Sequence, residues 1–424
     1  MINVNDFLKQ NDNDAFDAAI KARGADGIVL VTPRESEDGR DFWLLDRAIL
    51  LPSNTAMVLQ NCKIKLSDKC RDNFFRSANC GIGIEEIAPI SNIHIRGEGN
   101  AVLEGADHPR ATGDSGKLLG NPCPYTKEDL CRLADWIPEE FRTPETIRGR
   151  DRASHSFGTD AGNPLESQKG DWRNIGILFA NTSRFSISGL TVKDSHSWAI
   201  SLEACCGGVL EKLAFDSHRE RVIDGLLQDV KNQDGIDLRN GCHDITISDI
   251  SGRTGDDTVA LTAIAGGDFR PAGSLCGMHV MANDWTLRER DIYNVTIRNV
   301  RAYTHACHII RLLPCEARIY DIAVNGVIDT SPTECVTGGI FLGDRDGAYG
   351  RNLPGSLTGI TISNYLYNST EKPLRVDGYL QNSVITNVVN SRSQYPAIAV
   401  SREDGLQNVK INNIVAPKGI PVVQ

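Results

Sequence analysis

The sequence lacks several features that would point to whole classes of protein. It has no run of about 18 apolar residues, so no segment has the length of a transmembrane helix. It has no basic block, and its 45 Lys and Arg against 55 Asp and Glu leave a net charge of −10, which argues against nucleic acid or an anionic membrane as the main partner. No Cys-x-x-Cys pair occurs, so we expect no structural metal and no cofactor. An acidic substrate stays compatible if arginines and lysines gather in the cleft.

The start of the chain and its cysteines bear on location. Residues 1–7 have neither a basic n-region nor an apolar h-region, which predicts a cytoplasmic protein unless an export signal has been removed. The twelve cysteines are scattered and mostly embedded in apolar strings. We therefore expect reduced core thiols and not a disulfide framework.

Short strings in which apolar residues alternate with small or polar ones recur along the chain. Such alternation, rich in Ile, Val and Thr, is the mark of a half-buried strand, and an interposed Asn, Asp or Gly lets the chain turn a corner. We expect Asn299, Asn364 and Asn413 as corner residues or a stacked amide ladder. The six copies are residues 93–97, 185–190, 245–250, 295–300, 360–365 and 409–414.

A second strand-like string lies between successive copies, and Ile236 in one such string precedes Val259 in the next by 23 residues. That step is close to one coil of a solenoid made of three short strands. A coil cannot bury its inward face alone, so coils stack with parallel strands about 4.8 Å apart. The sequence therefore predicts an all-β right-handed parallel β-helix, formed as one domain over residues 1–424; an oligomer is compatible with this.

Helical pattern is scarce. Residues 12–23 place Phe16, Ala19 and Ile20 on one face and are expected to form a helix that caps the N-terminal end of the core. A second candidate helix, residues 125–141, lies inside a long insertion from about 106 to 171. This insertion is either a solvated excursion or a loop flanking the substrate cleft. A smaller insertion covers residues 217–231.

Acidic residues open two consecutive coils. Asp234 stands in Asn-Gln-Asp-Gly, and Asp256 and Asp257 stand in Gly-Asp-Asp; the 23-residue step places Asp234 against Asp257. Like charges this close cannot all ionise freely, so one carboxyl is expected to stay protonated. Glycoside hydrolysis uses such a set, one acid for the leaving oxygen and others to deprotonate water. Asp234 alone could merely cap a turn, but the doubled acids have no structural benefit.

At these residues the sequence resembles glycoside hydrolase family 28, the polygalacturonase-like enzymes of pectin and cell wall polysaccharide degradation. Residues 232–235 are similar to the family's Asn-Thr-Asp-Gly, with Gln in place of Thr, and residues 255–257 match its Gly-Asp-Asp. The similarity covers most of the chain, although only these two motifs are specific. It implies an inverting glycosidase of class EC 3.2.1. In that role Asp256 would be the general acid, and Asp234 and Asp257 would activate water.

The family's Gly-His-Gly motif is absent as such. His308 would take its place if its strand stacks directly on that of Asp257, and the rival is His279, which follows Asp256 by 23 residues. We favour His308, because its surroundings repeat the strand pattern around Asp257. By contrast, residues 266–284 have the composition of a loop.

The family's Arg-Ile-Lys motif, which grips a uronate carboxylate, has no clean equivalent. Arg311 is the nearest candidate, but no lysine follows it, so neutral sugars and other acidic sugars stay open beside galacturonate. Asn232, Asp237 and His305 are further candidate substrate contacts. The plainer interpretations are a solvent-facing residue for Asp237 and a histidine on the groove floor for His305.

Three functions are consistent with this pattern. The first is an exo-acting glycosidase on a uronic-acid-containing oligosaccharide or polysaccharide, with the long insertion blocking one end of the cleft. The second is a lyase or epimerase, which usually needs an Arg or Lys base and often calcium. The third is a non-catalytic carbohydrate-binding solenoid. The aspartate motifs favour the first.

Overall fold

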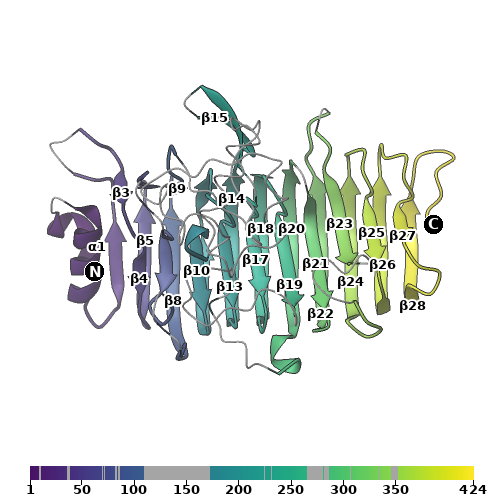
Figure 1. Ribbon diagram of the computed structural model, residues 1–424, viewed down its shortest axis with the longest axis horizontal. Helices are drawn as coiled ribbons and strands as arrows, with labels where there is room; N and C mark the ends of the chain where they lie inside the picture. Colours follow the sequence, from purple (N-terminus) through teal and green to yellow (C-terminus); the bar gives the residue numbers. More distant parts are fainter. Residues whose placement is uncertain are drawn as a thin grey trace, which may run out of the picture.

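The computed structural model confirms the predicted right-handed parallel β-helix, whose strands stack side by side along one long axis (Figure 1). Within the described residues, the strands form a 16-stranded sheet, a 10-stranded sheet and a 2-stranded hairpin. The first two sheets are the faces of the solenoid. The structure describes residues 1–8, 11–35, 39–68, 70, 72–81, 84, 86–108, 172–223, 225–230, 232–264, 280, 286–305, 307–333, 335–344 and 352–424.

The larger sheet contains all six predicted alternating strings, and its strands pair in parallel in chain order. Between the corner residues, outward and inward side chains alternate along these strands, as the period of two requires. Its main path is β1 (Ile2–Asn3), β2 (Ile28–Val31), β5 (Thr55–Gln60), β8 (Ile90–Glu98), β11 (Thr182–Ser188), β14 (Cys206–Asp216), β18 (His243–Thr254), β20 (Ile292–Thr304), β22 (Ile319–Asp329), β24 (Leu357–Tyr367), β26 (Leu380–Asn390) and β28 (Leu406–Val415), with β3 (Trp43–Leu45), β6 (Lys63–Leu66), β9 (Val102–Glu104) and β12 (Thr191–Lys193) beside it.

The smaller sheet is built from the second kind of string and carries the candidate site at its strand starts. Its strands also pair in parallel, each with the next along the chain. They are β4 (Ile49–Leu51), β7 (Phe75–Ser77), β10 (Ile177–Ala180), β13 (Ile200–Glu203), β17 (Ile236–Arg239), β19 (Val259–Ile264), β21 (His308–Cys315), β23 (Gly338–Gly343), β25 (Leu374–Asp377) and β27 (Ile398–Val400).

The core is a set of apolar rows that run along the solenoid axis. Ile236 pairs with Val259, Val259 with Ile310, and Ile310 with Ile340, and all four side chains are at most 1% exposed. Burial of one such side chain contributes about 1.5–3 kcal/mol. Because a slip of one residue would turn every apolar side chain outward, the rows also fix the register between coils.

The predicted coil of three separate strands is only partly what the structure contains. In β18 and β20 the two predicted strands on either side of a corner form one continuous strand. The corner residues Asp249 and Asn299 have φ of 58° and 56°, the left-handed region that Asn and Asp tolerate. A single such residue bends the chain without ending the ladder. Asn364 and Asn413 also have positive φ, and both are hydrogen-bonded to Asn387 at 3.1 Å, which makes the expected amide ladder.

The predicted N-terminal helix is present as α1 (Asp12–Ala22) and lies at the N-terminal end of the solenoid (Figure 1). Asn11 caps it, and Phe16, Ala19 and Ile20 are buried. The insertion at 217–231 contains an antiparallel hairpin that projects from the solenoid, formed by β15 (Glu220–Ile223) and β16 (Leu226–Asp229) (Figure 1). Short 3-10 helices are η1 (Val4–Phe7), η4 (Trp172–Asn174) and η5 (Arg288–Arg290).

Two other expectations meet the structure only in part. The candidate helix at 125–141 and residues 109–171 of the long insertion lie outside the described residues. The nine cysteines of the described ranges are free thiols, and six of them are buried. Over the same ranges, no helix has the length and apolar character needed to cross a membrane.

Candidate active site

The starts of β17, β19 and β21 lie in one row, so that residues far apart in sequence become neighbours. The amide of Gly235 donates to the carbonyl of Asp257 at 2.9 Å, and the amide of Thr258 donates to the carbonyl of His308 at 2.9 Å. The row is therefore Asp234, Asp257 and His308, one from each coil. This is the order expected from the 23-residue step.

Three carboxyl groups meet in this row. One oxygen each from Asp234, Asp256 and Asp257 lies within 4.8 Å of the others. Asp234 is 6% exposed and Asp257 9% exposed, whereas Asp256 is half-buried. Like charges that lie close together with little exposure to water destabilise the fold. Such groupings of titratable side chains are typical of active sites.

The backbone of Asp256 is held from three sides. Its amide donates to the carbonyl of Gln233 at 3.3 Å, and its carbonyl accepts from the hydroxyls of Thr254 at 2.7 Å and Thr304 at 2.6 Å. Gln233 is fully buried, and its side-chain amide donates to the carbonyl of Ser195 at 2.7 Å. The backbone carbonyl of Gln233 thus braces Asp256, a contact that the sequence did not reveal.

Two glycines of the aspartate motifs are required by close packing between coils. A Cβ on Gly235 would lie 2.5 Å from the carbonyl oxygen of Thr258, and a Cβ on Gly255 would lie 2.7 Å from Oε1 of Gln233. Any larger residue would push β17 away from β19 or displace Gln233. The glycines therefore keep the carboxyl groups one strand spacing apart.

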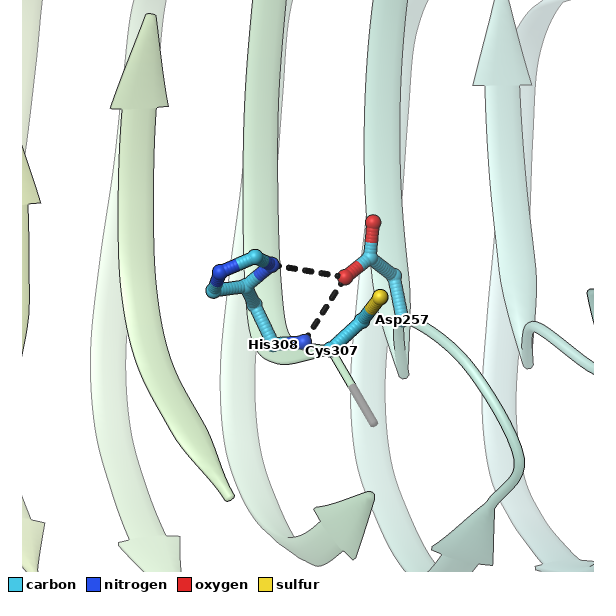
Figure 2. A group of neighbouring side chains, drawn as sticks. All are labelled: Asp257, Cys307 and His308. Carbon is cyan, nitrogen blue, oxygen red and sulfur yellow. Dashed lines mark hydrogen bonds and ion pairs between the residues drawn. The ribbon is translucent and has the colours of Figure 1, made fainter. Parts of the chain in front are cut away.

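His308 is hydrogen-bonded to Asp257 twice (Figure 2). Its backbone amide donates to Oδ1 of Asp257 at 2.8 Å, and its ring Nδ1 lies 3.1 Å from the same oxygen. Because an ionised carboxylate only accepts, Nδ1 is the donor in the contact with such a carboxylate. Gly338 makes room for the ring, since a Cβ there would lie 2.6 Å from its Cδ2.

Cys307 lies beside the same carboxyl (Figure 2). Burial, and then the negative charges of Asp257 and Asp256, raise the pKa of the Cys307 thiol well above its ordinary value. The thiol is therefore neutral at physiological pH.

Two sets in this part of the structure have the spacing of metal ligands, and they share Asp257. One is the three carboxyls, whose oxygen atoms suit magnesium or calcium. The other is Asp257, Cys307 and His308, whose mixed ligands suit a transition metal such as zinc.

The other predicted contacts lie around this row with varied exposure. Asn232 is 4% exposed, with a left-handed backbone at φ 56°, and Asp237 is 2% exposed, paired with Ala260. His305 is exposed, and its ring lies 6.3 Å from that of Tyr303. His279 lies outside the described residues. Of the predicted set, the structure brings together Asp234, Asp256, Asp257 and His308.

Arg311, Phe341 and Arg375 are in register on β21, β23 and β25, on the outer face of the smaller sheet. Arg311 is nevertheless only 8% exposed. Its Nη1 donates to the carbonyl of Gly343 at 2.6 Å, and its Cζ lies 3.6 Å from the ring centre of Phe341. Phe341 also contacts the ring of His308, with 4.8 Å between the ring centres. Sequence reasoning missed Phe341 and its neighbour Arg375, although continuing the strand register from Arg311 leads to both.

The comparisons with known proteins agree with this geometry. The model of "Glycosyl hydrolases family 28" matches residues 158–277, a segment that includes all three aspartates. The resemblance to family 28 is confirmed. The chain is a glycosidase, the class of enzyme predicted from its aspartates. His308 and Arg311 lie beyond the family 28 segment.

The solved structures that are similar to this chain include three polygalacturonases. The family 28 exopolygalacturonase of Yersinia enterocolitica is 12% identical, with 99% of this chain and 79% of that chain covered and a TM-score of 0.50. The hyperthermoactive exopolygalacturonase of Thermotoga maritima is 15% identical, with 97% and 91% covered and a TM-score of 0.49. The polygalacturonase of Erwinia carotovora is 13% identical, with 98% and 94% covered and a TM-score of 0.45. No curated protein matches the sequence.

Proposed function

We propose that this protein is an inverting glycoside hydrolase that removes units from the end of oligosaccharides containing uronic acid, of the kind found in pectin. The observation that supports it most is the meeting of three carboxyl groups within 4.8 Å at the starts of β17 and β19. The family 28 match over this segment agrees with the proposal. The long insertion, on which the exo mode rests, falls mainly outside the described residues.

In the proposed reaction Asp256 is the general acid. It gives its proton to the glycosidic oxygen as the bond from that oxygen to the anomeric carbon breaks. Asp234 and Asp257 hold a water molecule, which attacks the anomeric carbon and passes its proton to one of them. The products are two sugars, and one water is consumed. His308 donates to Asp257 and so holds that carboxyl in place.

The short spacing of the acids needs an explanation, because two carboxyls of an inverting pair commonly stand about 6.5–9.5 Å apart. Here the nearest oxygens are within 4.8 Å. The site has three acids, however, and Asp234 and Asp257 are paired across adjacent strands. We infer that these two share the attacking water. Asp256 also lies within 4.8 Å of both, so the anomer of the first product decides whether a water fits between the acid and this pair.

The proposal is tested by product analysis on acidic, rhamnose-containing and neutral oligosaccharides. We expect cleavage of an acidic oligosaccharide to single units from one end, with a new reducing end for each bond cut. Nuclear magnetic resonance of the first product should show the anomer opposite to that of the substrate.

Other products would contradict the proposal in specific ways. An unsaturated product that absorbs ultraviolet light, formed only without chelator, would mean a lyase. Retention of the anomer would mean that one aspartate attacks the sugar directly. Binding of the panel without any product would mean a non-catalytic solenoid.

A further inference from the structure

The candidate active site continues along the solenoid axis as a row of outward residues. Ala260 pairs with Arg311, Arg311 with Phe341, and Phe341 with Arg375, on strands β19, β21, β23 and β25. The ring of Phe341 contacts His308, whose own ring contacts Asp257. An unbroken chain of contacts therefore leads from the carboxyl groups to Arg375.

Phe341 lies between two guanidinium groups. The Cζ of Arg311 is 3.6 Å from its ring centre, and the Cζ of Arg375 is 4.4 Å from it. Stacking on an aromatic face stabilises a guanidinium and fixes its plane. The ring thus holds both cations in set orientations next to the site.

The two arginines differ in what they offer to a ligand. Arg311 is 8% exposed and its Nη1 donates to the carbonyl of Gly343, so it presents little surface to a ligand. The side chain of Arg375 is 34% exposed and forms an ion pair with Asp377. A guanidinium has five N–H donors in a fork that matches a carboxylate. Arg375 therefore keeps donors for an anion in addition to Asp377.

We propose that Arg375, stacked on Phe341, binds the carboxylate of the sugar unit that adjoins the cleaved bond toward the C-terminal coils. This rests on the proposed function, and it names the feature of the substrate that this chain selects. Strands β19 and β23 are two steps of about 4.8 Å apart, so the guanidinium over Phe341 lies roughly 10 Å along the axis from the carboxyl groups. That distance fits a neighbouring sugar and not the reacting carbon itself.

The test compares Arg375→Gln with Arg402→Gln. Arg402 is a close match: its side chain is 42% exposed, it pairs with Asp404 at 3.0 Å, and it stacks on Tyr379 at 4.7 Å, but it lies outside the row. Affinity for an acidic oligosaccharide is measured by calorimetry in an Asp256→Asn background. We expect Arg375→Gln to weaken binding by about 10–100-fold, the range for a charged hydrogen bond, and Arg402→Gln to leave it unchanged.

The carboxyl-reduced form of the same oligosaccharide shows whether Arg375 binds the carboxylate of the sugar or another group. Its affinity should be low and insensitive to Arg375→Gln. Equal losses for acidic and reduced ligands, or no loss for either, would overturn the inference.

This test separates the inference from the proposed function. If the native protein hydrolyses the oligosaccharide but Arg375→Gln does not change its affinity, the subsite is wrong and the proposed function stands. If binding depends on Arg375 but the native protein hydrolyses nothing, the proposed function is wrong and the subsite stands.

Discussion

Asp256→Asn is expected to lower kcat on every cleaved substrate by about 10²–10⁴-fold, the usual contribution of a general acid. An amide has the same shape but no proton to give to the leaving oxygen. The backbone of residue 256 is held by Gln233, Thr254 and Thr304, so the substitution should leave the loop in place and KM nearly unchanged. Steady-state rates of reducing-end release measure the effect.

Asp249→Asn is a matched control for this variant. Asp249 is an exposed corner residue with a left-handed backbone on β18, a conformation that asparagine adopts equally well. Its kcat should equal that of the native protein. Near-normal hydrolysis by Asp256→Asn would remove residue 256 from the role of acid.

Asp234→Asn is expected to lower kcat by a similar factor and, unlike most substitutions of a buried residue, to stabilise the fold. Asp234 is 6% exposed and shares its surroundings with two other carboxyls. Removal of one negative charge relieves their repulsion, and we expect a gain of about 0.5–2 kcal/mol in the free energy of unfolding. Thermal unfolding and rate assays on the same preparation measure both effects.

Asp329→Asn gives the opposite case. Asp329 is fully buried, and its carboxyl accepts from Ser331 and Asn368. Its substitution should cost about 1–3 kcal/mol of stability with little change in kcat. If Asp234→Asn behaved in this way instead, Asp234 would be a structural residue and not part of the chemistry.

The sequence predicted those parts of the protein that repeat. Alternation of apolar residues fixes which side chains face the core, and the 23-residue step between Ile236 and Val259 is the pairing found in the structure. The same step placed Asp234 against Asp257, and the repeat of strand pattern placed His308 next to them. Periodic burial carries this information, because a slip in register would expose the core.

Features outside the repeat could not be predicted in this way. The side chain of Gln233 contacts Ser195 on another coil, and a single contact of this kind leaves no pattern in the sequence. Arg311 is the nearest candidate in the sequence for gripping a uronate carboxylate, but in the structure it is stacked on Phe341 and buried. Outward residues such as Arg375 have no periodic constraint, so only the register of three successive strands reveals them.

A crystal structure of Asp256→Asn with an acidic oligosaccharide tests the central claim most directly, because the uncleaved ligand would span the three acids. The glycosidic oxygen should lie within hydrogen-bonding distance of residue 256, with a water molecule between Asp234 and Asp257 at the anomeric carbon. A ligand bound on another face of the solenoid, or bound here with its glycosidic oxygen far from residue 256, would contradict the claim.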